Sequence, residues 1–289
     1  MAADSWERRR ELIFALELHR AECEFLTGEL AKAEERLTML SSRAATAVEL
    51  ATVACLRVDV YTTLDQSDRA VAACLDYLRH VDIDWSPHPT EEQGRREYQQ
   101  IWSQLGSRAI EALVDLPLMS DPAYLATLDV LTKMSPPALF TDANLLCLAI
   151  CRAVNLSLER GNGDGSCVAY VMLGMIAGLR FGNYEAGFRF GRLGCELVEQ
   201  RRLERFQAGT YMSFANLVMP WTKHVKACRD LLRRAFDAAN KRGDLTFAAF
   251  CCNNINTNLL AAGDPLVLGA TPSREWRRIC AEGAVWSRY

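Results

Sequence analysis

The stretch GNYEAGFRF, residues 182–190, joins two apolar segments through a short polar turn, and it guides the interpretation of the whole chain. GELAKA at 28–33 and DQSDRA at 65–70 have the same form, and their turns lie 37 residues apart. Further turns are predicted near Pro220 and at Gly263-Asp264. Periods of roughly 34 to 47 residues are typical of helical-hairpin solenoids, whose units bury their apolar faces against neighbours. The pattern predicts an all-α fold of antiparallel helix hairpins.

Helical spacing of apolar residues predicts further elements outward from these turns. The first hairpin is expected over 5–26 and 29–41, with Leu12, Leu16, His19 and Cys23 on one helical face. The other helices are predicted at 45–64, 67–81 with Ser67 as N-cap, 166–181, 183–200, about 205–218, 222–241 and 245–262. Strict apolar/polar alternation of the kind that strands show is not found.

The middle of the chain, around 85–165, has an irregular rhythm. Thr90 and Gln93 form a capping-box pattern that opens a helix expected to reach about Val114. Asp121-Pro122 has the N-cap and first-turn proline of a second helix, which Ser135-Pro136-Pro137 is expected to close. A third helix is predicted from Thr141-Asp142 to Arg160, followed by a flexible loop at 161–165.

Composition narrows the class of protein. The 289 residues carry a net charge of -3, which gives no general reason to expect nucleic acid or an anionic membrane as partner. The eleven cysteines are scattered and odd in number, as expected for thiols in a reducing cytoplasm. Most of them are predicted to lie in apolar helix faces: Cys55, Cys74, Cys147, Cys151, Cys251 and Cys252. No apolar run reaches the roughly 20 residues of a membrane span, and no signal peptide is indicated. The predicted location is cytoplasmic.

Small residues inside the second helix of each hairpin, Ala33, Ala70 and Gly187, resemble those of tetratricopeptide-like repeats. The characteristic Trp, Leu and Gly of the first helix are mostly missing, and so is the Pro between units. The resemblance therefore implies a TPR-like antiparallel helix-hairpin solenoid over 1–266, without strict repeats.

Four stretches carry a narrower resemblance: WSPHPTEE (85–92), LPLMSDP (116–122), GNGDGS (161–166) and FGNYEAGF (181–188). Together they are similar to the helical segment that follows the AAA/STAND-type ATPase module in large bacterial signalling proteins. Such proteins carry a Ser/Thr-kinase-like domain before the ATPase, and GAF and histidine-kinase domains after the helical segment. The resemblance implies a non-enzymatic interaction or sensor scaffold that relays the state of a protein partner, a ligand or an attached signalling domain. Two alternatives remain open: part of an ATP-binding histidine or Ser/Thr kinase, or a helical regulator that senses a small metabolite.

Catalytic motifs of that family are not found in this sequence. The Gly-rich stretch 161–166 lacks the Lys of a phosphate-binding loop and follows no predicted strand, and neither kinase motif, His-Arg-Asp nor Asp-Phe-Gly, occurs. Cys147 and Cys151 share a helix face, yet they lack the Cys-x-x-Cys spacing of zinc sites. The sequence predicts no catalytic, cofactor-binding or metal-binding residues.

Two groups of residues are candidates for partner binding. Lys226, Arg229 and Arg233 make one helix basic, which indicates either a solvated face or a site for an acidic partner. Tyr211, Asn254 and Asn258 lie on helices expected to line a concave surface, where Asn amides can hold a peptide backbone. The alternative is that these amides satisfy helix ends.

The predicted turn at Gly263-Asp264-Pro265-Leu266 is not followed by a second apolar helix. Residues 267–289 are therefore interpreted as an atypical tail, truncated or diverged from a longer ancestor. The apolar face of 245–262 would then be partly uncovered, which predicts self-association through this C-terminal end.

Overall fold

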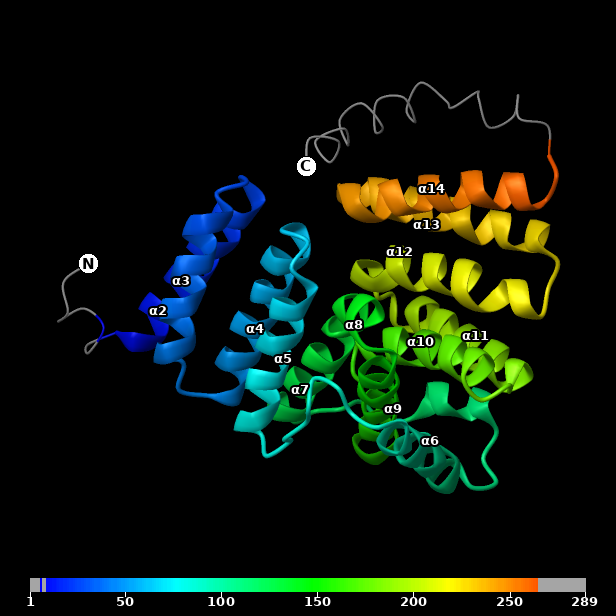
Figure 1. Ribbon diagram of the computed structural model, residues 1–289, viewed down its shortest axis with the longest axis horizontal. Coiled ribbons are helices and arrows are strands. Elements are labelled where there is room, and N and C mark those ends of the chain that lie inside the picture. The colour runs from blue at the N-terminus through cyan, green and yellow to red at the C-terminus, as the bar shows by residue number, and fades with distance from the viewer. Residues whose placement is uncertain (1–5, 7–8, 265–289) are drawn as a thin grey trace. The chain divides into compact units, whose positions relative to one another are not determined.

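The computed structural model describes residue 6 and residues 9–264, and its regular structure in this range is helical (Figure 1). A single β-bridge, between Leu118 and Asn162, is the only strand-like pairing among these residues. The all-α prediction is confirmed, whereas the predicted tail at 267–289 lies outside the described residues. None of the described helices is both long enough and apolar enough to cross a bilayer.

The chain divides into two compact units, Met1–Gln104 with Leu118–Gly163, and Leu105–Pro117 with Asp164–Tyr289. The helices of the first unit are α2 (Arg10–Leu26), α3 (Leu30–Arg43), α4 (Ala47–Thr63), α5 (Ser67–His80), α6 (Glu91–Leu105), α7 (Pro122–Lys133), α8 (Ser135–Thr141) and α9 (Ala143–Arg160). Those of the second are η1 (Ile110–Asp115), α10 (Ser166–Leu179), α11 (Tyr184–Arg201), α12 (Glu204–Ser213), the π-helical turn η2 (Phe214–Val218), η3 (Met219–Trp221), η4 (Val225–Cys228), α13 (Arg229–Arg242) and α14 (Leu245–Ala261).

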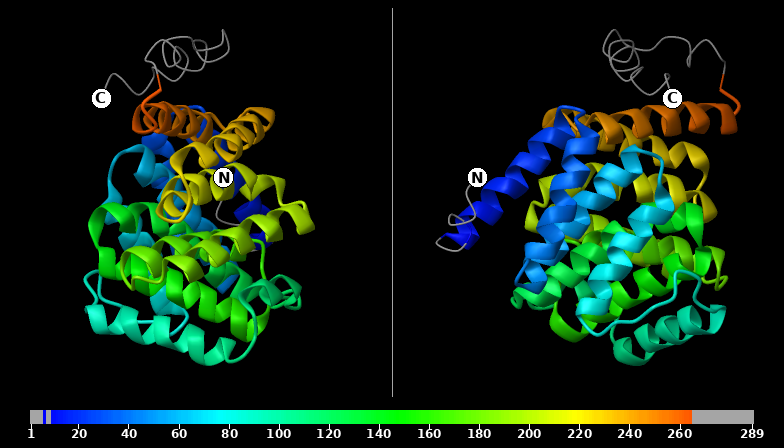
Figure 2. Two further views of the ribbon diagram at one scale, coloured as in Figure 1. Left: turned by 90° about the vertical axis from the view of Figure 1, so that its right-hand side faces the viewer. Right: turned by 60° about the vertical axis from the view of Figure 1, so that its left-hand side comes forward.

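Sequential helices pack side by side in both units. In the first unit α2 pairs with α3 and α4 with α5, while α4 also packs on α7, and α7 and α8 pack on α9 (Figure 1). In the second, α10 pairs closely with α11, and α12, α13 and α14 follow in a stack (Figures 1 and 2). Helices α9 and α10 each have twelve buried residues, and the sequence of α10 is nearly continuously apolar, as expected for a buried helix.

One turn geometry closes several of the hairpins. The residue after the helix has positive φ at Gly28 (82°), Asp65 (56°), Gly243 (70°) and Gly263 (69°). In each case the next N–H donates to a carbonyl five residues earlier, for example from Gln66 to Tyr61 at 2.8 Å. This is the Schellman pattern, which satisfies carbonyls that the helix end leaves unpaired. The predicted turns at 28, 65 and 263 are therefore confirmed as one repeated structure.

Helix starts follow the sequence signals in three of four cases. Asp121 accepts from the N–H of Ala123 at 2.8 Å, and Asp142 accepts from Asn144 and Leu145 at 2.8 and 2.9 Å. The Gln93 side chain accepts from the Thr90 N–H at 2.8 Å, which is half of the predicted capping box. Ser67 as an N-cap is wrong, since Ser67 is the first helical residue and the preceding residue makes no side-chain cap.

Four further predictions are corrected. The helix from Thr90 ends at Leu105, because Gly106 adopts φ 57°, and only a 3-10 turn covers 110–115. Ser135-Pro136-Pro137 opens α8 instead of closing a helix, since proline is tolerated in a first turn. The loop 161–165 is largely buried and packed against α7. On α2 the predicted face is exposed, and the buried residues are Ile13, Phe14, Glu17 and Ala21.

Glycines bring the backbones of α10 and α11 into direct contact. A Cβ placed on Gly187 would lie 2.5 Å from the carbonyl oxygen of Gly174, and one on Gly194 would lie 2.5 Å from that of Cys167. Real Cβ atoms do not approach backbone oxygen this closely, so any side chain at either position must push the helices apart. The predicted close approach at Gly187 is confirmed. Ala33 and Ala70, its counterparts in the first unit, are fully buried.

An ion pair anchors η1 to α11 within the second unit. Arg189 donates two hydrogen bonds to Glu111, at 2.8 and 2.7 Å, and these bonds are the main cause that lowers the pKa of Glu111 to about 2. Since the carboxylate is stabilised in the folded state, its contribution is present above the ordinary Glu pKa of about 4.5 and is lost as the pH falls towards 2.

We therefore expect Glu111→Gln to lower the free energy of unfolding at pH 7 and to have a shrinking effect from pH 5 to pH 2.5. Urea unfolding of both proteins across this range measures the difference. Glu196→Gln, which removes a carboxylate that pairs only with Arg192 on the same helix, is the matched control. A difference that stays constant with pH would contradict the assignment.

Candidate functional site

Tyr211, a predicted partner-binding residue, lies fully buried where α11, α12 and α13 meet. Its hydroxyl donates to Glu199 Oε1 at 3.0 Å and accepts from Arg234 at 3.1 Å, and the Arg234 guanidinium lies 4.7 Å from the ring centroid. Arg234 also donates to Glu199 Oε1 at 2.7 Å, which lowers the pKa of Glu199. One carboxylate oxygen thus connects three helices, and the phenol is fully engaged inside the unit.

The first unit contains the same arrangement. Tyr61 on α4 donates to Glu34 Oε1 on α3 at 3.4 Å, and Arg69 on α5 donates to the same oxygen and, at 3.2 Å, to the Tyr61 hydroxyl. Arg69 lies over the Tyr61 ring at 4.3 Å. Glu and Arg are 35 residues apart in both copies. We call these two groups the Tyr–Arg–Glu clusters; each joins the second helix of one hairpin to both helices that follow.

Asn258, Arg229 and Lys226 also come together within the second unit. Asn258 is nearly buried; its Nδ2 donates to the Val225 carbonyl at 2.7 Å and its Oδ1 accepts from Arg229 Nε at 2.8 Å. Asp264 accepts from Arg229 and pairs with Lys226 at 3.5 Å. This network connects the start of α13 to the end of α14, as the helix-end alternative predicts for the amide. The use of these side chains for partner recognition stays a prediction.

The other two predicted residues differ in exposure. Asn254 is half-buried, and its Nδ2 lies 3.3 Å from the Met212 sulfur. Arg233 projects into solvent with 64% of its side chain exposed and pairs only with Asp230, one turn earlier on the same helix. Of the six predicted residues, Arg233 therefore retains the most unused capacity for an acidic partner.

A basic face runs along η4 and α13 and comprises Lys226, Arg233, Arg234 and Lys241. Their side chains are 51–73% exposed. Residues 223–242 contain seven Lys or Arg and two Asp, in a protein whose net charge is -3. Arg234 and Lys241 also pair with Glu199 and Glu204 on neighbouring helices. Lys226 pairs with Asp264 as described above, so three of the four residues of the basic face support the stack. The field of the whole face favours acidic partners.

An exposed aromatic pair in the second unit was not singled out by the sequence. Tyr184 and Trp221 stack with ring centroids 5.7 Å apart and are 38% and 55% exposed. The sequence does not reveal this pair, because Tyr184 and Trp221 lie 37 positions apart along the chain. Aromatic side chains of this kind are common at recognition surfaces.

Across residues 6 and 9–264, no three His, Cys, Asp or Glu side chains gather as a metal site. The ten described cysteines are free thiols, and all but Cys23 and Cys55 are buried. Burial raises the pKa of Cys167 and of Cys251 to about 12, which keeps both thiols protonated.

Comparison with known proteins gives one informative similarity. The chain is 20% identical over 280 residues to hybrid signal transduction histidine kinase G of Dictyostelium discoideum, and the match covers 90% of this chain. It spans only 8% of the length of that kinase. No protein-family model matches the chain.

Proposed function

We propose that this chain is a helical-repeat interaction segment of a signal-transduction protein, with binding and relay as its role and no catalytic chemistry of its own. The observation that carries the proposal is the similarity to a hybrid histidine kinase along 90% of the chain. Because the match spans 8% of that protein, we do not infer kinase activity for this chain.

The arrangement of hairpins supports a TPR-like architecture, which we propose for this chain together with its kinship to the helical segments of AAA/STAND-type signalling ATPases. The Schellman turns and the Tyr–Arg–Glu clusters recur at comparable places in the hairpins of both units. Arrays of this type present extended surfaces made from many helices, and their usual role is to hold other proteins.

For this role the basic face is the proposed contact for an attached or partner signalling domain, through acidic side chains. Electrostatic complementarity of this kind sets the rate and specificity of association more than its strength. Differential contact with two states of the partner would then bias those states, which is how a non-enzymatic segment relays a signal.

Isothermal titration of the chain with the histidine-kinase module of the Dictyostelium protein tests the proposal. Wild-type chain is expected to bind the module, and Arg233→Glu with Lys241→Glu to weaken binding about tenfold, with a smaller dependence on salt. Arg95→Glu with Arg96→Glu on α6 is the matched control, because it reverses two exposed charges, 47% and 73% exposed, on another helix.

The same titration with MgATP is expected to give no binding heat. Saturable ATP binding by the chain, or wild-type chain that does not bind the kinase module, would refute the proposed role. If both double variants lose the same affinity for the kinase module, the loss is a general effect of charge. The basic face would then have no specific part in the proposed role.

A further inference from the structure

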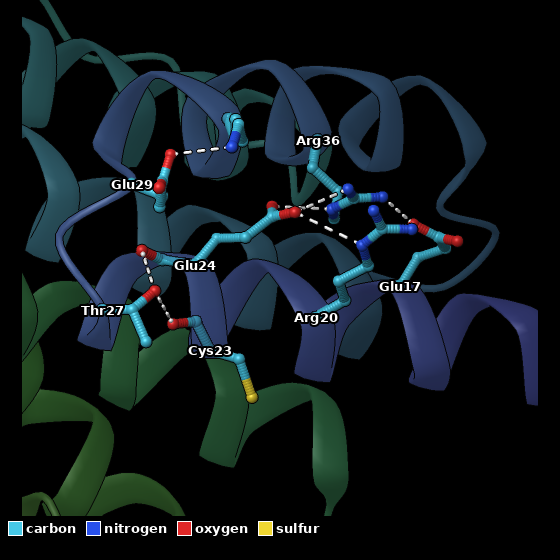
Figure 3. Close-up of polar contacts among 8 residues, drawn as sticks. Glu17, Arg20, Cys23, Glu24, Thr27, Glu29 and Arg36 are labelled. Carbon is cyan, nitrogen blue, oxygen red and sulfur yellow. Dashed lines mark hydrogen bonds and ion pairs between the residues drawn. The ribbon is translucent and has the colours of Figure 1, made fainter.

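Helix α2 has apolar side chains on two opposite faces. Its inner face, with Ile13, Phe14 and Ala21, is buried in the first unit. The outer face carries Leu12, Leu16, His19 and Cys23, which were predicted to share one helical face, and also Leu26; we call these five residues the outer stripe. The three leucines are 51%, 55% and 73% exposed. The Cys23 sulfur points away from α3 and from the polar cluster between the two helices (Figure 3).

A helix with apolar residues on both faces normally has neighbours on both sides. Helix α4 illustrates this in the same unit: it packs on α3 as well as on α5 and α7, and six of its residues are buried. Helix α2 packs on α3 and on the edge of α4. Within residues 6 and 9–264 of this unit, the outer stripe has no such neighbour. The outer stripe therefore lies where one further helix would pack if the stack of hairpins continued beyond α2.

The spacing of the outer stripe fits a helix as its occupant. Successive members are four, three, four and three residues apart, which is the a/d seam of two helices packed by knobs into holes. The seam extends about 21 Å, at 1.5 Å per residue over fourteen residues. Charged side chains border it, with Arg20 on one edge and Glu22 on the other, both more than half exposed. An apolar seam with charged edges is the usual form of a helix-docking surface.

The size of the stripe decides what kind of helix can occupy it. Stable interfaces between independent proteins bury about 800 Å² per partner from roughly 20–30 residues, whereas the outer stripe offers five. A second copy of this chain, bound through α2 alone, would lie far below that size. A helix that is tethered near α2 meets an effective concentration in the millimolar range, so a small seam is sufficient for it.

We propose that the outer stripe is the docking surface for an amphipathic helix with leucine-class side chains, supplied by a tethered neighbouring module of the same signalling assembly. The inference rests on the proposed function for the identity of that assembly. Docking would extend the helical stack beyond α2 and would link the position of the neighbouring module to the first hairpin.

The exposed thiol of Cys23 gives a direct readout. The full chain is fused ahead of Met1, through a flexible Gly/Ser linker, to a three-heptad probe helix with Leu at positions a and d. Mass spectrometry of the Cys23 peptide measures the rate at which iodoacetamide alkylates this thiol. The rate is expected to be about fivefold lower than in the unfused chain, because the probe helix covers the outer stripe most of the time. The matched probe with Gln at a and d is expected to leave the rate unchanged.

Leu16→Glu with Leu26→Glu in the Leu-probe fusion is expected to restore the fast rate, with unchanged hydrogen exchange in α3 as evidence of folding. Equal rates with the Leu and Gln probes would overturn the proposal. If alkylation of Cys23 in the unfused chain slows as the protein concentration rises, the outer stripe binds a second copy of the chain. That result would contradict a tethered helix as the occupant. Cys23 protection together with no binding to the kinase module would retain the docking surface and refute only the proposed function.

Discussion

Gly187→Ala is expected to destabilise the second unit by about 2–3 kcal/mol, even though alanine is the better helix former by roughly 1 kcal/mol. The added Cβ would lie 2.5 Å from the Gly174 carbonyl oxygen, and the contact is with backbone, which cannot rotate away. The helices α10 and α11 must then separate, and the buried side chains along their whole contact lose packing. Gly187→Ala with Gly194→Ala is expected to prevent stable pairing of the two helices.

Hydrogen exchange with mass spectrometry measures this locally. Peptides from α10 and α11 should exchange roughly 30–150 times faster in Gly187→Ala, the factor that corresponds to 2–3 kcal/mol, while peptides from α2 and α3 stay unchanged. Gly94→Ala on α6 is the matched control: its Cβ would meet the Cys147 side chain at 3.1 Å, which a small shift relieves. If Gly187→Ala and Gly94→Ala accelerate hydrogen exchange in their own helices equally, the backbone contact between α10 and α11 is not as tight as described.

Arg36→Met is expected to cost about 3–5 kcal/mol in the first unit, because it leaves a buried carboxylate without its cation. Arg36 on α3 donates to Glu17 and, at 2.7 and 2.8 Å, to Glu24, both on α2 (Figure 3). The Glu17 side chain is only 6% exposed. The bonds from Arg36 lower the pKa of Glu24, whereas Arg20 gives Glu24 a second partner. In Arg36→Met, Glu24 therefore keeps one cationic partner, whereas Glu17 is left as the buried carboxylate without one.

Urea unfolding and hydrogen exchange in α2 and α3 measure the loss. Glu17→Leu added to Arg36→Met should recover most of it, since replacement of a buried ion pair by apolar residues is often neutral or stabilising. Lys32→Met removes an exposed partner of Glu29, the N-cap residue of α3, and should cost less than about 1 kcal/mol. A double variant no more stable than Arg36→Met would show that packing of the Arg36 stem, and not the stranded charge, causes the loss.

Local signals in the sequence predicted the hairpins well. Turn residues and caps such as Asp142 act over three to five residues, so their effect can be inferred from neighbours alone. The face of α2 could not be inferred in this way. Leu12 with Leu16 and Ile13 with Ala21 both follow helical spacing, and periodicity does not say which stripe meets α3.

The candidate site shows the same limit at longer range. The sequence singles out Tyr211 and Asn258 as candidates for binding, and a buried phenol or amide needs a hydrogen-bond partner. Their partners, Glu199 for Tyr211 and Arg229 for Asn258, belong to other helices and become neighbours only when the helices stack. Tyr211 and Asn258 were therefore predicted to contact a partner protein. In the fold, each belongs to an internal hydrogen-bond network, which contains Glu199 in one case and Asp264 in the other.

The Tyr–Arg–Glu clusters have a mechanical consequence. In each, a single carboxylate oxygen holds a tyrosine and an arginine from two different helices, so sliding the acid-bearing helix along its axis breaks both bonds at once. Junctions secured in this way are stiff towards shear, and junctions that rely on apolar contact alone are compliant because dispersion is not directional. When tension is applied across the helix stack of either unit, strain concentrates at its compliant junctions, and the secured junction moves as a solid block.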